Sequence, residues 1–288
     1  MRTALGELAN PLGLPAGYDK TGAHLRDLSR LGFGYIVAGT FTLSPYTGNP
    51  KPRVARNPKE KTLVNSLGFP NPGVDAFLHT TMSQDKLGVP LVASISGKTV
   101  EDNVACYSRV QPHVDGVELN LSSPNTPDLR DLREPDEFAE LANAMRAVKS
   151  KPTYLKATPF IDEEQYLGVL RQVKTWEEIG FEGVTCSNSL PLEDPRMAIG
   201  RGGLSGPPLL DRTKAAVTRI RRTVANTFEI NACGGISSPE DASALLGLGA
   251  TTVQVFTALV YQGPKLVGNI LRDPNVRLAV QGGKTLDG

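Results

Sequence analysis

The chain has 288 residues, of which 31 are basic and 30 acidic, so its net charge is only +1. This balance excludes the strongly basic footprint of a nucleic-acid-binding domain or of a protein held at an anionic membrane surface. Hydrophobic residues make up 40% and charged residues 21%, which is ordinary for a globular fold and excludes a largely disordered chain. The length allows two small domains or one barrel of roughly 250 residues.

Short apolar segments alternate with longer amphipathic segments along the chain. The apolar segments predict strands at residues 33–38, 90–95, 116–121, 153–157, 183–186, 228–232 and 252–256. The amphipathic segments predict helices that include residues 99–110, 136–149, 163–179, 212–224 and 239–246. Thr99 and Ser238 have the N-cap chemistry that begins a helix. Residues 14–20 are a candidate for a further strand at the start, which would bring the number to eight.

The alternation of strand and helix predicts a parallel sheet. An open doubly wound sheet usually has a glycine-rich turn after its first strand, and no GxGxxG occurs here. The glycines suited to a phosphate come after the seventh predicted strand, which is where a closed barrel binds phosphate. We therefore predict a TIM (β/α)8 barrel, formed by residues 1–288 as a single domain. Residues 44–63 are expected to form a small hairpin or loop excursion after strand 2.

Targeting, cysteine and metal signals are mostly negative. The start of the chain has no long apolar segment, and no stretch reaches the roughly 20 apolar residues that span a bilayer. The three cysteines are widely spaced without a CxxC pair, and the three histidines stand alone. Thiols in a reducing compartment fit this pattern better than disulfides or a metal site. We therefore predict a cytoplasmic protein with no metal, no nucleic-acid partner and no stable membrane anchor.

Polar side chains gather at the predicted ends of several strands, which in a barrel face the active site. An amide both donates and accepts hydrogen bonds, so asparagines suit a small planar ligand with carbonyl and N–H groups. Turn chemistry alone accounts for one such loop, but three loops at successive strand ends favour a small-molecule site. The residues concerned are Asn65, Asn120, Ser122, Ser123, Asn125, Lys156, Ser187, Asn188 and Ser189.

Two glycines and a threonine form a second group near the end of the chain. Gly234 and Gly235 follow the seventh predicted strand, and Thr257 follows the eighth. Glycine allows a ligand to approach the backbone closely, and a helix that begins nearby directs N–H groups at an anion. This group predicts a phosphate cradle, although glycines that serve only tight turns would give the same pattern.

Two lysines stand in surroundings that are costly for a charge. Lys156 lies within the apolar strand TYLKA, where an inward ammonium needs an anionic partner. A lysine that snorkels at an edge is the alternative. Lys20 in AGYDK has the same ambiguity, with Asp19 as a candidate neutralising neighbour. We expect both lysines to belong to a functional site.

The sequence resembles the dihydroorotate dehydrogenase family. The resemblance runs from about residue 14 to residue 271 and rests on AGYDKTG, NPKPRVARNPKEKTLVNSLGFPNPGVDAF, LNLSSPNTPDLRDL, PTYLKATP, TCSNS, GRGGLSGPPL, NACGGISSPEDA and VQVFTALVYQGP. It implies a TIM-barrel enzyme that carries flavin mononucleotide (FMN) and oxidises dihydroorotate to orotate in pyrimidine biosynthesis. The alternatives are a related flavin barrel acting on another dihydropyrimidine-like substrate, a non-redox phosphate-binding barrel such as an isomerase or lyase, and a non-catalytic descendant of the family.

The resemblance also implies roles for individual residues. Ser123 matches the catalytic base, Lys156 the lysine beside the flavin pyrimidine ring, and Thr126, with Phe69, a proton path to water. The positions that match the substrate site are Lys20, Asn65, Gly68, Phe69, Asn120, Asn125, Asn188 and Ser189. The positions that match flavin contacts are Ala16, Gly17, Lys20, Thr40, Asn120, Lys156, Ser187, Ser205, Gly206, Gly234, Gly235, Phe256 and Thr257.

In the implied mechanism, Ser123 removes the C5 proton of dihydroorotate while hydride passes from C6 to flavin N5. Serine as the base resembles the membrane-associated branch of the family, which reduces quinone. VASISGKTVEDN, with Ile95, is more similar to the soluble branches, and only 15 residues precede AGYDK. The electron acceptor is therefore left open, as are a homodimer and an electron-transfer partner subunit.

Overall fold

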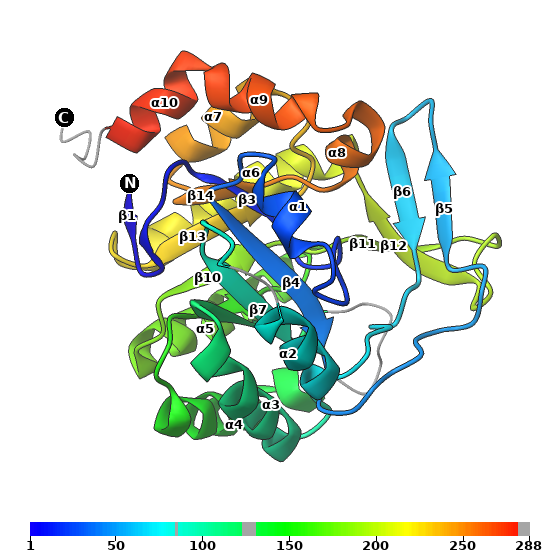
Figure 1. Ribbon diagram of the computed structural model, residues 1–288, viewed down its shortest axis with the longest axis vertical. Helices are drawn as coiled ribbons and strands as arrows, with labels where there is room; N and C mark the ends of the chain where they lie inside the picture. The colour runs from blue at the N-terminus through cyan, green and yellow to red at the C-terminus, as the bar shows by residue number, and fades with distance from the viewer. Residues whose placement is uncertain (84–85, 123–130, 282–288) are drawn as a thin grey trace.

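The structure, a computed structural model, describes residues 1–83, 86–122 and 131–281. Within these residues eight parallel strands close into a barrel in the spatial order β10, β13, β14, β3, β4, β7, β8, β9. The predicted TIM barrel is thus confirmed (Figure 1). Its strands are β3 (Leu12–Leu14), β4 (Tyr35–Phe41), β7 (Leu91–Ile95), β8 (Gly116–Asn120), β9 (Thr153–Lys156), β10 (Gly183–Cys186), β13 (Glu229–Cys233) and β14 (Thr252–Gln254).

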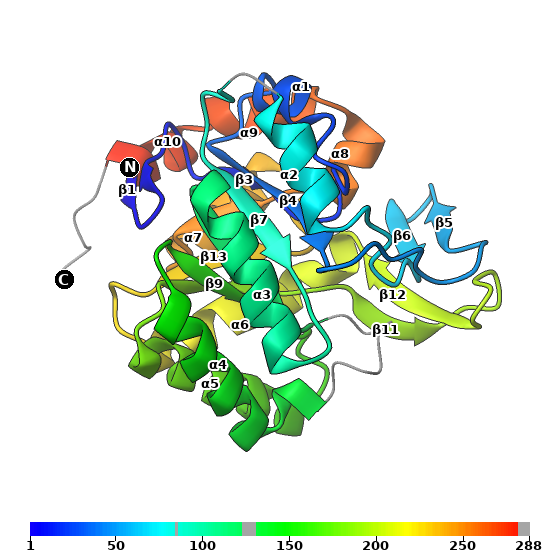
Figure 2. The same ribbon diagram turned by 60° about the horizontal axis from the view of Figure 1, so that its bottom comes forward.

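A helix comes after each barrel strand, and the helices surround the barrel (Figure 2). They are α1 (Leu25–Ser29), α2 (Val74–Met82), α3 (Val100–Val110), α4 (Pro135–Val148), α5 (Glu163–Ile179), α6 (Leu210–Thr223), α7 (Pro239–Gly247) and α8 (Thr257–Gln262), followed by α9 (Lys265–Arg272) and α10 (Pro274–Gln281). Short 3-10 turns lie at η1 (Gln111–His113), η3 (Asp131–Arg133) and η4 (Pro207–Leu209).

The predicted N-caps are present. Thr99 Oγ1 accepts a hydrogen bond from the backbone N–H of Asp102, and Ser238 Oγ accepts one from Asp241. Asp162 caps α5 in the same way. Each cap satisfies an N–H group that the first helical turn leaves unpaired, which is why these helices begin where the sequence predicts.

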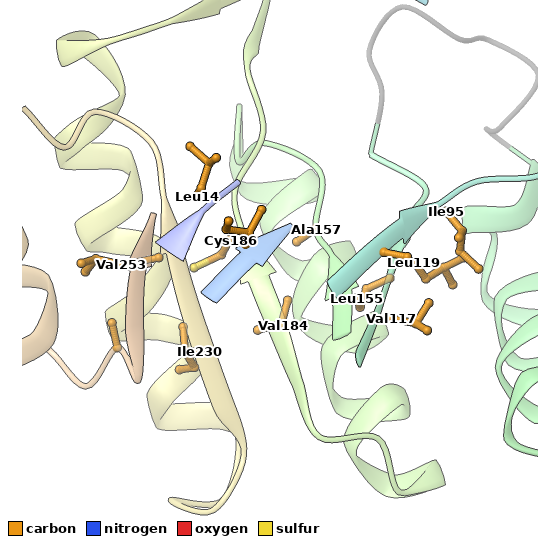
Figure 3. Close-up of a cluster of buried hydrophobic side chains, with 14 of the residues drawn as sticks. Leu14, Ile95, Val117, Leu119, Leu155, Ala157, Val184, Cys186, Ile230 and Val253 are labelled. Atoms are coloured by element: carbon orange, nitrogen blue, oxygen red, sulfur yellow. The ribbon is translucent and has the colours of Figure 1, made fainter. Parts of the chain in front are cut away.

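The main hydrophobic core lies between the barrel and its helices. In Figure 3 the side chains of Leu14, Leu155 and Ile230 belong to a cluster that lines the barrel strands, and all three are buried. Neighbouring residues along a strand face opposite sides, so the alternate residues point into the barrel. Two of these, Asn231 and Thr252, are polar and are hydrogen-bonded to each other. The barrel interior is therefore partly polar.

The first barrel strand lies earlier than the sequence predicts. Residues 14–20 were expected to supply it, but β3 covers Leu12–Leu14. Pro15 has no N–H for a strand ladder, and Gly17 has a φ of +103°, so the chain leaves the sheet at this point. The AGYDK segment is therefore a loop at the carboxyl end of β3.

The predicted hairpin after the second barrel strand is present but belongs to a larger sheet. Its strands are β5 (Val54–Asn57) and β6 (Thr62–Asn65). They join β11 (Leu190–Glu193) and β12 (Arg201–Ser205), which follow β10, in a four-stranded antiparallel sheet in the order β11, β12, β6, β5. Figure 1 shows this sheet beside the barrel, and we call it the accessory sheet.

The opposite end of the barrel carries a small hairpin, β1 (Arg2–Thr3) and β2 (Gly6–Glu7). Leu8 follows it and packs in a separate buried cluster with Tyr35, Val37 and Val92. The Ala4 N–H donates to the carboxylate of Glu229 at the start of β13. These contacts cover the amino ends of the strands, so a ligand site is expected at the carboxyl ends.

Candidate active site

A cavity of about 340 Å³ lies at the carboxyl ends of the barrel strands, next to the accessory sheet. This volume is within the range of small-molecule sites. The segments that follow β3, β10, β13 and β14 line it, together with the ends of β4, β8 and β9. The cavity therefore occupies the place where the sequence predicts the site.

Every predicted site residue that the structure describes lines this one cavity, except Ser122, which is hydrogen-bonded to two of the lining residues. These residues are Ala16, Gly17, Lys20, Thr40, Asn65, Gly68, Phe69, Asn120, Lys156, Ser187, Asn188, Ser189, Ser205, Gly206, Gly234, Gly235, Phe256 and Thr257. Ser123, Asn125 and Thr126 lie outside the described residues. The structure thus brings the described residues together, while the role of each one stays a prediction.

A chain of hydrogen bonds crosses the floor of the cavity. Asn188 Nδ2 donates to Ser122 Oγ at 2.8 Å, and Ser122 Oγ donates to Asn120 Oδ1 at 2.8 Å. Asn120 Nδ2 donates in turn to Thr40 Oγ1 at 2.8 Å, which is 3.0 Å from Ser94 Oγ. Because the side chains come from four strands or the loops after them, the network fixes their mutual orientation. It extends to Ser122, the residue immediately before the predicted base.

Two lysines line the cavity in different electrostatic surroundings. Burial, together with the smaller effects of the nearby Lys156 and Arg53 charges, lowers the pKa of Lys20 to about 8. The expected pairing of Lys20 with Asp19 is not found, because the Asp19 carboxylate accepts backbone N–H groups of the loop that follows it. Among the described residues no carboxylate lies within ion-pair distance of Lys20, which leaves its ammonium for an anionic ligand.

Lys156 has a buried carboxylate beside it that the sequence analysis missed. Glu118 lies on the adjacent strand β8, and its Oε1 is 3.7 Å from Lys156 Nζ. Glu118 is 1% and Lys156 6% exposed, so water screens neither charge well. A glutamate within the apolar strand GVELN was the available signal, since a buried charge in a barrel interior requires a partner.

The predicted phosphate cradle lies where two glycines meet the start of a helix. Gly235 has a φ of +80°, and a Cβ there would lie 2.2 Å from the backbone nitrogen of Leu210, the first residue of α6. Gly206, just before η4, has a φ of +114°. Thr257 Oγ1 donates to Ser205 Oγ at 2.8 Å across the same end of the cavity. Backbone N–H groups and hydroxyls therefore concentrate here, as an anion site requires.

The barrel interior supplies one further cavity residue that was not predicted, Gln254. Its side chain is 1% exposed, and its Nε2 donates to Tyr35 OH at 2.9 Å. Within the described part of the chain its Oε1 receives no hydrogen bond. A buried acceptor without a donor is costly, so a ligand with an N–H group at this point would stabilise the site. Glutamine inside an apolar strand, VQVF, was the available signal.

The accessory sheet supplies the outer wall of the cavity. Val54 and Arg56 on β5 line it, and Val54 is 50% exposed. These two residues were not predicted as site residues, because the side of a hairpin that faces a site cannot be read from its sequence alone. Their position makes one wall of the opening both apolar and cationic.

Residues 3–278 match the family model described as dihydroorotate dehydrogenase. The chain belongs to the dihydroorotate dehydrogenase family. It is 36% identical over 283 residues to a protein of Alkalilimnicola ehrlichii named dihydroorotate dehydrogenase (quinone), covering 92% of this chain and 82% of that one. The predicted family and the prediction of an oxidoreductase are therefore confirmed.

Other relatives agree with this assignment. A protein of the same printed name from Methylobacillus flagellatus is 36% identical, with 91% of this chain and 83% of the relative covered. A crystal structure of DHODH from Eimeria tenella in complex with ferulenol superposes with a TM-score of 0.81 at 26% identity, over 90% of this chain and 79% of that one. The closed barrel is thus a fold that this chain shares with that solved structure.

Two searches of the described residues gave negative results. They contain no group of three or more histidine, cysteine, aspartate or glutamate side chains placed to hold a metal ion. They also contain no helix with the length and apolar character needed to cross a bilayer.

Proposed function

We propose that this chain oxidises dihydroorotate to orotate, with FMN as its cofactor, in de novo pyrimidine biosynthesis. The observation that carries the proposal is one cavity that combines an ammonium without a carboxylate partner among the described residues, an amide and hydroxyl network and a predicted phosphate cradle. Membership of the dihydroorotate dehydrogenase family supports the substrate.

The donor set of the cavity fits FMN. Gly206, Gly235 and the start of α6 would hold the phosphate, together with Ser205 and Thr257, and a Cβ at Gly235 would fill space that the cradle needs open. Gln254 Oε1 is a buried acceptor without a donor from the described residues, and a flavin ring carries an N–H group. Lys156 supplies a cation for the flavin pyrimidine ring.

The substrate would bind through the remaining polar groups. Dihydroorotate carries one carboxylate and a ring of alternating carbonyl and N–H groups. The Lys20 ammonium, which has no carboxylate partner among the described residues, would hold the carboxylate by a charge-assisted hydrogen bond. Asn65, Asn120 and Asn188 would hold the ring, because amides match both its donors and its acceptors. Two of these amides are already oriented by the network through Ser122.

Catalysis then requires removal of two hydrogens from adjacent carbons. Ser123 would take the C5 proton, and Ser122, Asn120 and Asn188 would hold the substrate ring against it. FMN, when bound, is the group that accepts the hydride from C6. The Lys156 ammonium would stabilise the negative charge that develops on the flavin pyrimidine ring as the flavin is reduced. Thr126 would pass the C5 proton onward to water, along a path that Phe69 helps to shape.

We propose a quinone as the physiological electron acceptor. The relatives compared above carry quinone in their names, which supports a quinone over fumarate or NAD. The exposed side chain of Val54 beside the cavity offers an apolar surface to such a ring. A homodimer, or a complex with an electron-transfer partner subunit, stays a prediction.

Anaerobic reduction tests the proposed function. The purified protein should show a flavin spectrum that dihydroorotate bleaches, and decylubiquinone should restore it faster than fumarate or NAD. A protein with flavin that only another dihydropyrimidine bleaches would point to the related substrate. A colourless protein that gains no flavin from added FMN would contradict the proposal.

Replacing Ser123 by alanine tests the base. A positioned general base contributes roughly 10²- to 10⁴-fold, so S123A should slow flavin reduction by about that factor while FMN stays bound. Stopped-flow absorbance under anaerobic conditions measures the rate. S122A is the matched control for the hydrogen-bond network. An unchanged rate of flavin reduction in S123A would refute the role of Ser123 as the base.

A further inference from the structure

Glu118 lies beside Lys156, which lines the cavity, and has no task in the proposed mechanism. It lies two residues before Asn120 on β8, so both side chains point into the barrel. Its carboxylate is 1% exposed, and Oε1 is 3.7 Å from Lys156 Nζ. A carboxylate buried to this degree is retained at a considerable cost, which calls for an explanation.

The charge of Glu118 acts mainly on Lys156. Oε1 receives no hydrogen bond from any described residue, so local donors do not spread its charge. Tyr35 and Cys233 face the same interior, and the Glu118 charge raises the pKa of both, in addition to the larger effect of burial. Both groups are therefore neutral near pH 7. Lys156 is the cation within ion-pair distance.

The distance between the two charges is also informative. A charge-assisted hydrogen bond between nitrogen and oxygen is about 2.7–2.9 Å long, which is shorter than the observed separation. Glu118 therefore attracts the Lys156 ammonium but does not form a short hydrogen bond with it. Its N–H donors remain available on the cavity side, where Lys156 is a lining residue.

The two lysines of the cavity differ in this respect. Lys20 has no carboxylate within ion-pair distance among the described residues, whereas the charge of Lys156 is partly offset from behind. The Lys20 cation is thus left for an anionic ligand, and the buried Lys156 cation is held in place beside the ring that the cavity is proposed to bind. The presence of Glu118 beside Lys156 distinguishes the two lysines.

We propose that Glu118 is a positioning residue whose buried carboxylate holds the Lys156 ammonium in place and moderates how strongly that cation favours the reduced flavin. This inference rests on the proposed flavin function. A cation near the flavin stabilises the negative charge of the reduced form, and a fixed anion behind that cation opposes the effect. Loss of the carboxylate therefore leaves the cation unopposed.

The test is the midpoint potential of the bound flavin, measured anaerobically with reference dyes at pH 6.5, where ordinary lysines carry their proton. Dihydroorotate is absent, so the result does not depend on turnover. Glu118→Gln, which removes the charge and keeps the shape, should shift the potential to a more positive value. Glu118→Asp, which keeps the charge but moves it about one methylene away, should give a smaller shift in the same direction.

Glu182→Gln is the matched control. Glu182 pairs with Lys149 in the same barrel but at the amino end of β9, far from the cavity. The Glu182→Gln substitution should lower thermal stability, because it removes a partly buried ion pair. It should leave the midpoint potential of the bound flavin unchanged. A merely structural role for Glu118 would give this same pattern in Glu118→Gln and would overturn the proposal.

The outcomes of these measurements separate the role of Glu118 from the proposed flavin function. If Glu118→Gln fails to retain flavin, Glu118→Asp decides, and a wild-type potential in that variant overturns the proposal. If wild-type protein holds flavin that dihydroorotate bleaches, but neither Glu118 variant shifts the potential, only the role of Glu118 fails. Wild-type protein that binds no flavin would overturn this inference together with the proposed function.

Discussion

Lys20 and Lys156 line one cavity, yet their neighbours give them different chemistry. Burial and two nearby cations lower the pKa of Lys20 to about 8, which means that the folded protein disfavours its charged form. An anionic substrate reverses that cost, because it brings the missing negative charge. Lys156 receives part of this compensation from Glu118 before any ligand arrives. In the proposed function, these two side chains would therefore divide the work, with Lys20 in substrate binding and Lys156 in redox chemistry.

The pKa of Lys20 predicts a pH dependence. As the pH rises through about 8, Lys20 loses its proton and the free enzyme loses its partner for the substrate carboxylate. The value of kcat/KM for dihydroorotate should then fall about tenfold per pH unit, since this ratio reports the groups of the free enzyme. Lys20→Arg, which stays charged, should lack this fall. A profile that is the same in both proteins up to pH 10 would contradict the role of Lys20.

At the scale of elements, loops at the carboxyl ends of the strands supply most of the site, and the start of one helix completes it. The backbone at Gly235 approaches α6 so closely that a side chain has no room, which brings the N–H groups of the helix start toward the cavity. The positions of the strands and caps follow from hydrophobic periodicity and N-cap residues, both of which are local. The close approach of loop and helix is not local, and only the closed barrel produces it.

Gly235→Ala tests this approach. The new Cβ would lie 2.2 Å from Leu210 N at a φ of +80°, so the loop or the helix must move. The free energy of unfolding should fall by more than about 1 kcal/mol, and FMN should bind more weakly. Denaturant unfolding and flavin fluorescence titration measure the two effects.

Gly247→Ala is the control for this substitution. Gly247 ends α7, and a Cβ there would meet no atom within 4 Å. Alanine in a helix is favoured over glycine by roughly 0.5–1 kcal/mol, so this variant should be unchanged or slightly more stable. Normal FMN binding in Gly235→Ala would show that the phosphate lies elsewhere.

At the scale of the whole molecule, the barrel and the accessory sheet enclose the cavity from two sides. Strands β5 and β6 follow the second barrel strand, while β11 and β12 follow the sixth, so two distant parts of the chain build one wall. A ligand in the cavity therefore contacts segments from the beginning to the end of the sequence. Its binding should stabilise the fold as a unit.

Removal of FMN should lower the melting temperature. Ligand at 100 times its dissociation constant adds about 2.7 kcal/mol to the stability of the native state. For a domain of this size that corresponds to roughly 5 °C. Differential scanning fluorimetry of the apo-protein with and without FMN measures the shift. Riboflavin, which lacks the phosphate, should give a smaller shift, and equal shifts would contradict the phosphate cradle.

The amino-acid sequence by itself determined the barrel strands from β4 onward to within a few residues, the caps of α3 and α7, and the set of polar residues at strand ends. These follow from apolar periodicity and local hydrogen bonding, which neighbouring residues decide. The resemblance to a family assigned their roles, and for Ser123, Asn125 and Thr126 that assignment stands without a described position.

Only the tertiary structure decided how distant segments meet. It ended the first strand at Leu14, joined the hairpin to β11 and β12, and put Glu118 beside Lys156 and Gln254 beneath the cavity. The last three are contacts between segments far apart in sequence, and no local pattern specifies them. They arise because a closed barrel forces the inward side chains of all its strands into one small interior, where each charge and each polar atom must find a partner across the barrel.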